Sequence, residues 1–140
     1  AALDRTARFG DGWIGFAVSP RRYSRAVVSI EQRAAAFGRT AAWDHGLVVW
    51  CGLADDRAAA RHSLATEMEA LYKLPFEKFA RYAAWGSPDD IAARLSEYVD
   101  AGCRSFTLIP VAAAGASPVD GVARVRQLLN GSRAPQLSYR

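Results

Sequence analysis

The sequence predicts an α/β fold in which parallel strands are covered by helices. Short apolar runs, each followed by a helical pattern, lie at residues 12–18, 46–53 and 105–111. These runs are apolar throughout rather than alternating, which is typical of parallel strands that are buried on both faces. Consecutive strands of this kind are joined by right-handed helical crossovers.

A repeated helix start supports this fold. Serine followed by proline occurs at Ser19-Pro20, Ser87-Pro88 and Ser117-Pro118. Serine is a preferred N-cap residue, and proline fits the first helical position, where no backbone N–H is needed. Asp90, three residues after Ser87, completes an acidic variant of the capping box. The sequence therefore predicts a helix after each of the three pairs.

The N-terminal part of the chain reads as the end of a helix, a strand and a long helix. The helix after Ser19 carries its apolar residues on one face, at Tyr23, Val27, Ile30, Ala34 and Phe37. Gly38 is placed to end this helix, because glycine accepts the left-handed conformation common at that position. The second apolar run follows at 46–53.

The C-terminal part adds two helical pieces before the next capped helix. A helix is predicted from about Asp55, and a second helical piece spans 75–82. The helix after Ser87 ends at Gly102 and leads directly into the third apolar run. Inward-facing residues are predicted in these helices at Leu64, Met68, Leu71, Ile91, Leu95, Tyr98 and Val99, and in the last helix at Val122, Val125, Leu128 and Leu129.

Composition limits the classes of function. The chain has 140 residues, 51% of them hydrophobic, and a net charge of +4, so one domain with a real core is expected. The arginines are scattered as on solvated helix faces, and no basic run with aromatic residues suggests nucleic-acid binding. No apolar run is long enough for a membrane span, and Cys and His show no metal-ligand spacing. We expect a cytoplasmic protein that acts on a small molecule.

The two cysteines test the parallel arrangement. Cys51 falls near the end of its strand, and Cys103 lies just before the start of the next. In parallel neighbours these positions are at opposite ends, about 15 Å or more apart. A disulfide needs Cα atoms within about 7 Å. Both thiols are therefore predicted to be free.

Two segments resemble a known family. TARFGDGWIG, at 6–15, resembles the helix-to-strand junction of the luciferase-like monooxygenases, which are flavin- or F420-dependent (βα)8 barrels. GSPDDIAARLSEYVDAGCRSFTLIP, at 86–110, resembles the segment that leads into their last strand. The resemblance implies the last three strand-helix units of a TIM-type (βα)8 barrel, with FMN or coenzyme F420 as cofactor. It also implies oxidoreductase activity for the full barrel, while a non-catalytic half-barrel that serves as an assembly or binding module is the alternative.

Candidate cofactor contacts follow from this fold. In such barrels the chemistry lies at the C-terminal ends of the strands and in the loops that follow. Ser19, Arg21 and Arg22 begin the helix after the first strand, where an anion would be stabilised. Trp50 and Cys51, at the end of the second strand, could contact a flat ring. No residue stands out as catalytic or as a metal ligand, whereas His45 and the pairs Asp55-Asp56 and Asp89-Asp90 are best read as structural.

The domain is predicted to run from 1 to 140, with a helical insertion at about 55–85 on the active-site side. The insertion contains five aromatic residues, Tyr72, Phe76, Phe79, Tyr82 and Trp85. These residues could form a pocket lid, an interface or a satellite core. Three strands leave open sheet edges and an apolar face, so we also expect the chain to associate as a homodimer.

Overall fold

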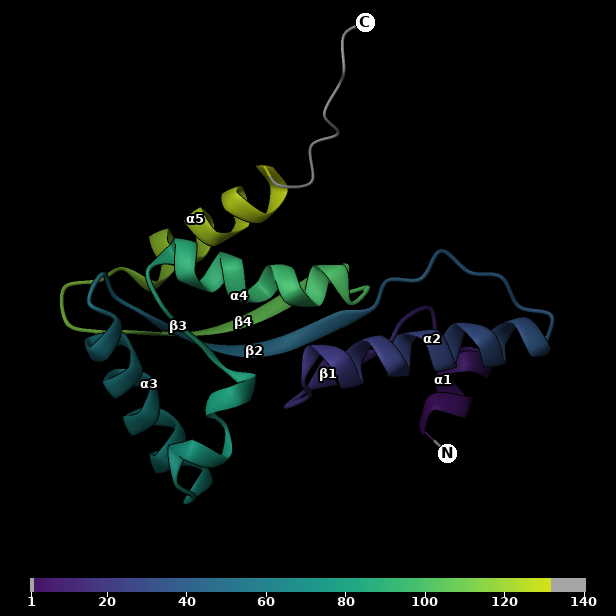
Figure 1. The fold of residues 1–140 in the computed structure, drawn as a ribbon, viewed down its shortest axis with the longest axis horizontal. Helices are drawn as coiled ribbons and strands as arrows, with labels where there is room; N and C mark the ends of the chain where they lie inside the picture. Colours follow the sequence, from purple (N-terminus) through teal and green to yellow (C-terminus); the bar gives the residue numbers. More distant parts are fainter. Residues whose placement is uncertain (1, 132–140) are drawn as a thin grey trace, which may run out of the picture.

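The computed structural model describes residues 2–131, which form one parallel sheet with helices on both of its faces (Figure 1). The strands are β1 (Ile14–Phe16), β2 (Gly46–Leu53), β3 (Ala84–Gly86) and β4 (Ser105–Ala112). The helices are α1 (Ala2–Phe9), α2 (Pro20–Ala36), α3 (Arg57–Tyr72), α4 (Pro88–Asp100) and α5 (Pro118–Gly131). Two short 3₁₀ turns, η1 (Phe76–Lys78) and η2 (Ala80–Tyr82), follow α3. None of the helices in this part of the chain is both long and apolar enough to cross a membrane.

Strand β2 is the centre of the sheet. It pairs with β4 along its whole length, from Gly46 opposite Ser105 to Leu53 opposite Ala112. On its other edge it pairs with β1 near its start and with β3 near its end. All three pairings are parallel, which confirms the predicted α/β class and the parallel strands.

Strand β3 was not predicted from the sequence. Its three residues, Ala84–Gly86, pair with the last three residues of β2. A strand this short has no readable periodicity, and its last residue also opens the Gly-Ser-Pro helix start. The insertion predicted at about 55–85 therefore consists of α3, the two 3₁₀ turns and most of this strand.

The helix-covered face of the sheet carries the main core. Alternate β2 residues point into it, and Leu47, Val49 and Leu53 are each no more than 3% exposed. Helices α2, α4 and α5 supply the opposing side chains, which include Tyr23, Val27, Ile91, Leu95, Tyr98 and Val125. The predicted inward faces of α4, α5 and the first half of α2 lie in this layer, whereas Ile30 and Ala34 pack with Ala7 of α1 in a separate cluster. The prediction is wrong for Phe37 and Leu71, which are 45% and 60% exposed.

The opposite face of the sheet, here called the inner face, is covered only in part. Helix α3 and the 3₁₀ turns pack over the C-terminal half of β2 through a second cluster that contains Leu64, Met68 and Phe76. Beyond this cover, Ile14 and Phe16 of β1 remain 66% and 50% exposed. The prediction that every strand is buried on both faces holds for most of β2 and is wrong for β1 and for β4, whose residues are half-buried or exposed.

The predicted boundaries and thiols can be followed in the structure. Gly102, just after α4, has φ +98°, and Gly38, just after α2, has φ +71°, so both helices end at left-handed glycines. Neither Cys51 nor Cys103 forms a disulfide within the described residues, as predicted. Cys51 lies opposite Pro110, which is roughly 20 Å along β4 from Cys103.

Candidate active site at the strand ends

The site begins with the turn between β1 and α2. Ala17 has φ +48°, a left-handed conformation that is uncommon for a residue with a side chain. This turn brings Ser19 to the N-cap of α2, where its side chain makes no capping hydrogen bond. The Ser19 hydroxyl and the first backbone N–H groups of α2 are therefore available to an anion.

Arg21 and Arg22 lie in the first turn of the same helix, and both are exposed. Cations are unfavourable there because they meet the positive end of the helix dipole. Neither arginine has an ion pair or a hydrogen bond within residues 2–131. Three of the five predicted contacts, Ser19, Arg21 and Arg22, are thus brought together by the structure.

Trp50 lies on the inner face, at the edge of a narrow apolar crevice. Its indole Nε1 donates a hydrogen bond to the Tyr72 hydroxyl at 3.1 Å, and the two rings meet edge to face. The residues that line the crevice carry no formal charge and come from three parts of the chain: Phe16, Ala17, Val48, Trp50, Met68, Phe79, Tyr82 and Ala83. Because Ala17 is one of them, the crevice adjoins the turn that leads to Ser19.

Cys51 lies on the other side of the sheet. Successive residues of a strand point to opposite faces, so the Cys51 side chain enters the helix-covered core and is 1% exposed. Burial raises the pKa of this thiol to about 12. The structure therefore does not bring the Cys51 thiol to the face that carries Trp50.

Four of the five aromatic residues of the insertion belong to the satellite core that was one of the predicted alternatives, and the fifth, Tyr82, lines the crevice. Phe76 is 1% exposed and meets Trp85 edge to face, while Tyr72 packs against Phe79 with ring centres 4.9 Å apart. This core is not remote from the crevice, because Met68 and Phe79 belong to both. The insertion thus forms one wall of the candidate site.

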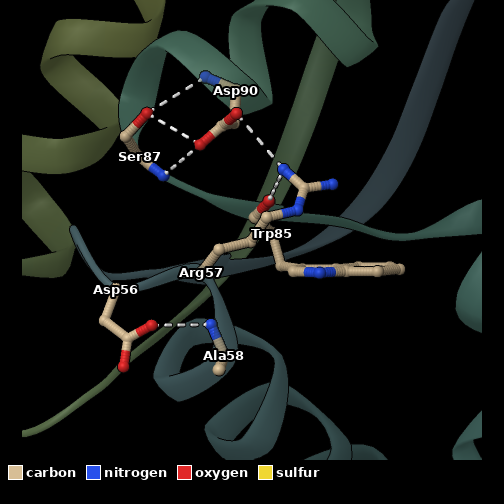
Figure 2. A network of polar contacts seen from close by, with 6 residues as sticks. All are labelled: Asp56, Arg57, Ala58, Trp85, Ser87 and Asp90. Carbon is tan, nitrogen blue, oxygen red and sulfur yellow. Dashed lines mark hydrogen bonds and ion pairs between the residues drawn. The ribbon is translucent and has the colours of Figure 1, made fainter.

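A network of polar contacts fixes the insertion to the sheet (Figure 2). Ser87 and Asp90 form the predicted capping box at the start of α4, and hydrogen bonds from Ser87 lower the pKa of the Asp90 carboxyl. Asp56 caps α3 by accepting from the Ala58 N–H at 2.9 Å. Arg57 joins the two helix starts, because its Nη1 lies 3.2 Å from both the Trp85 carbonyl oxygen and the Asp90 carboxylate.

The sequence did not predict the role of Arg57. It lies thirty positions from Ser87 and thirty-three from Asp90, and no motif marks the pairing. Asp56 and Asp90 serve the helix starts, as predicted. The network positions the start of α3, and therefore the aromatic wall of the crevice.

A wider hollow opens between the turn after β2 and the loop after β4. Most of the residues that line it are small, and they include Ala54, Ala59, Ala113, Ala114, Gly115, Ala116 and Gly121. Asp55, Asp56 and Asp120 are the charged groups on its lining. Small side chains allow a ligand to come close to the backbone, and the hollow lies at the strand ends where barrel enzymes bind their ligands.

His45 lies at the opposite end of β2 and is 1% exposed. Its Nδ1 accepts a hydrogen bond from the Trp13 N–H at 3.1 Å, and its ring stacks on Trp43. Burial lowers the pKa of His45, against the smaller opposite effect of Glu31 at 3.6 Å. The residue has the structural role that its position before the strand predicted.

Solved structures share this arrangement, although the sequence matches no protein-family model and no curated protein. An F420-dependent secondary alcohol dehydrogenase superposes with a TM-score of 0.74 at 13% identity, over 94% of this chain and 46% of that one. The coenzyme F420-dependent tetrahydromethanopterin reductase of Methanopyrus kandleri superposes with a TM-score of 0.67 at 17% identity, over 93% of this chain and 47% of that one. Monooxygenase RslO1 of Streptomyces bottropensis superposes with a TM-score of 0.62 at 24% identity, over 95% of this chain and 44% of that one.

The chain folds as one half of a luciferase-like barrel. This confirms the fold that the two sequence segments predicted. The chain spans less than half the length of these three structures. In the luciferase-like barrel the inner face of each strand lines the interior, so the exposed part of the inner face is the side that the rest of a barrel covers.

Proposed function

We propose that the chain is part of a luciferase-like oxidoreductase that uses FMN or coenzyme F420. The observation that carries this proposal is the adjacency of uncharged aromatic side chains, Phe16 and Trp50, and a helix start without a side-chain cap, near the C-terminal ends of parallel strands. Similar structures are described as F420-dependent enzymes, as a monooxygenase, and as a riboflavin lyase with modified FMN. When bound, such a cofactor supplies hydride transfer.

The residues present fit the chemistry of such a cofactor. Phe16 and Trp50 offer apolar aromatic surface to a flat ring, and no charged side chain lines the crevice beside them. Ser19 offers a hydroxyl, and α2 offers unpaired backbone N–H groups to a phosphate. Arg21 and Arg22 add positive charge next to that position. These residues would bind and orient the cofactor, and the aromatic wall would exclude water from it.

Binding of FMN and riboflavin tests this function. Riboflavin has the same ring system as FMN but lacks the phosphate, so the ratio of their dissociation constants reports the anion contact alone. We expect FMN to bind more tightly than riboflavin, and we expect Arg22→Gln to weaken FMN by about three-fold to ten-fold, since each ten-fold corresponds to roughly 1.4 kcal/mol. Quenching of flavin fluorescence provides the measurement.

Arg25→Gln is the matched control. Arg25 is exposed on the same helix, about one turn further along, and makes no ion pair or hydrogen bond within the described residues. Its loss changes the net charge equally but lies outside the first turn, where the helix dipole acts. Equal binding of FMN and riboflavin to the wild type, or equal effects of the two substitutions, would contradict the anion site.

A second candidate function is an assembly module, and the exposed inner face favours it. Ile14 is 66% exposed and Phe16 50% exposed, and the outer edge of β4 is unpaired within residues 2–131. A second copy could cover this face and edge and so form a homodimer without catalytic activity. A dimer mass in light scattering at micromolar concentration, together with the absence of flavin binding, supports this candidate. A mass that stays near the 15.2 kDa of one chain contradicts it.

The same proposal includes the compartment. Two thiols that form no disulfide are typical of a reducing environment, so we place the protein in the cytoplasm.

A further inference from the structure

A buried hydroxyl joins α4 to the turn that begins the candidate anion site. The Tyr98 side chain is 1% exposed, and its hydroxyl donates a hydrogen bond to the Val18 carbonyl oxygen at 2.8 Å. The two residues are 80 positions apart in the sequence. A buried tyrosine hydroxyl needs a partner, and here that partner is the backbone of the turn rather than a neighbouring side chain.

The turn has a conformation that needs support. Ala17 adopts φ +48°, which an alanine holds only when its surroundings favour it. Val18, the next residue, packs its side chain on the main core, and its carbonyl oxygen is the acceptor for Tyr98. Without the hydrogen bond, the Val18 carbonyl would lose one of the contacts that hold it in the orientation that the left-handed Ala17 requires.

Close packing around Gly15, which precedes the turn, leaves little space for the turn to move. A side-chain carbon at Gly15 would lie 2.9 Å from the Tyr23 ring and 3.1 Å from Val18. Tyr23 in turn meets the Tyr98 ring edge to face, with centres 6.0 Å apart. The Tyr98 ring and hydroxyl therefore contact both the first turn of α2 and the residue that precedes its cap.

We propose that Tyr98 is a positioning residue for the N-terminus of α2. By holding the Val18 carbonyl, it fixes the turn at Ala17 and so sets the direction in which Ser19 and the first backbone N–H groups of α2 point. The proposal rests on the proposed function, because the orientation of Ser19 and the α2 N–H groups matters for function only if the helix start binds an anion. Burial also raises the pKa of Tyr98, so the hydroxyl stays protonated and remains a donor at physiological pH.

Hydrogen exchange of the free protein tests the positioning without any ligand. Tyr98→Phe keeps the ring and removes only the donor. We expect the amides of residues 23–25, the first hydrogen-bonded turn of α2, to exchange about five-fold faster, while α5 amides keep their rates relative to global unfolding. The Tyr23 N–H is a suitable reporter because it bonds to the Ser19 carbonyl oxygen at 2.8 Å.

Asp56→Ala is the matched control for general destabilisation. It removes one hydrogen bond, the cap of α3, in an element distant from the turn. A cap and a buried hydrogen bond contribute to stability to a similar degree, so any exchange change caused by global destabilisation appears in both variants. Equal exchange at residues 23–25 in Tyr98→Phe and Asp56→Ala would overturn the proposal.

Ligand discrimination separates positioning from simple structural support. If Tyr98 orients the anion site, Tyr98→Phe lowers the preference for FMN over riboflavin by about three-fold or more, with little change in riboflavin binding itself. An unchanged preference, in a wild type that has one, overturns the proposal. A wild type without any preference refutes the anion site of the proposed function instead, and hydrogen exchange then decides whether Tyr98 orders the turn.

Discussion

Gly12 is the position where one added carbon should disturb the fold most. The chain passes so close to its neighbour there that a Cβ on Gly12 would lie 2.7 Å from the Asp44 carbonyl carbon and closer still to its oxygen. Contacts of this kind do not occur with real side chains, so Gly12→Ala must push two backbone segments apart by roughly 1 Å. The atoms that would have to move are backbone, which cannot swing aside as a flexible side chain can.

The cost follows from the hydrogen bonds that join these segments. The Asp44 N–H donates to the Asp11 carbonyl oxygen at 3.0 Å, and the Gly46 N–H donates to the Trp13 carbonyl oxygen at 2.9 Å. A third bond joins the Trp13 N–H to the buried Nδ1 of His45. Losing two or three such bonds at about 1 kcal/mol each, and leaving a buried imidazole nitrogen unpaired, costs about 3–5 kcal/mol.

Urea unfolding followed by tryptophan fluorescence measures this loss. A domain of this kind has roughly 5–15 kcal/mol of stability, so Gly12→Ala should lower the unfolding midpoint strongly or prevent folding. Gly131→Ala is the control, because a Cβ at that exposed position meets no atom of residues 2–131 within 4 Å. A Gly12→Ala midpoint within error of the wild type would mean that the close approach of the two segments is wrong.

Three further predictions use other features. Titration of the denatured, unreduced protein should find two reactive thiols, Cys51 and Cys103, whereas the folded protein should protect both; finding none after denaturation would contradict the parallel strands. Gly102→Val should lower stability by about 1 kcal/mol or more, because φ is +98° and the Val27 side chain lies 3.3 Å from the added carbon; an unchanged melting temperature would refute this helix end. The pKa of His45 is lower in the folded chain than in the unfolded chain, where it is about 6.5. The stability that neutral His45 contributes to the fold is therefore complete above that pH and is lost as the pH falls below it. The unfolding midpoint of the wild type should therefore fall between pH 7.5 and 5.5 by more than that of His45→Gln, and equal falls would count against this assignment.

The sequence predicted those features that depend on neighbours along the chain. The helix after Ser87 was recognised in full, because its cap, its proline, its apolar face and its glycine end lie within one segment. The same reasoning could not find β3, which has three residues and is defined only by its pairing with β2. Short strands depend on a partner, so their own residues carry little signal.

The candidate site shows the same division. Ser19, Arg21 and Arg22 lie together because they share one helix start. Cys51 and Trp50 were grouped because they are adjacent, but adjacent residues of a strand face opposite sides of a sheet. The apolar pattern of β2 gave no indication of which side would be the inner face, since its residues are apolar on both.

The position of β4 in the sequence has a consequence for biosynthesis. Strand β2 is complete once residue 53 has been made, yet the strand that pairs with its full length comes only at 105–112. Until then the nascent chain exposes an eight-residue apolar edge, with β1 and later β3 covering parts of the other side. Open edges of this kind pair readily with other chains, so a ribosome that pauses before residue 105 would prolong the lifetime of an aggregation-prone intermediate. Slow translation between 53 and 105 should therefore lower the soluble yield, whereas slow translation after 112 should not.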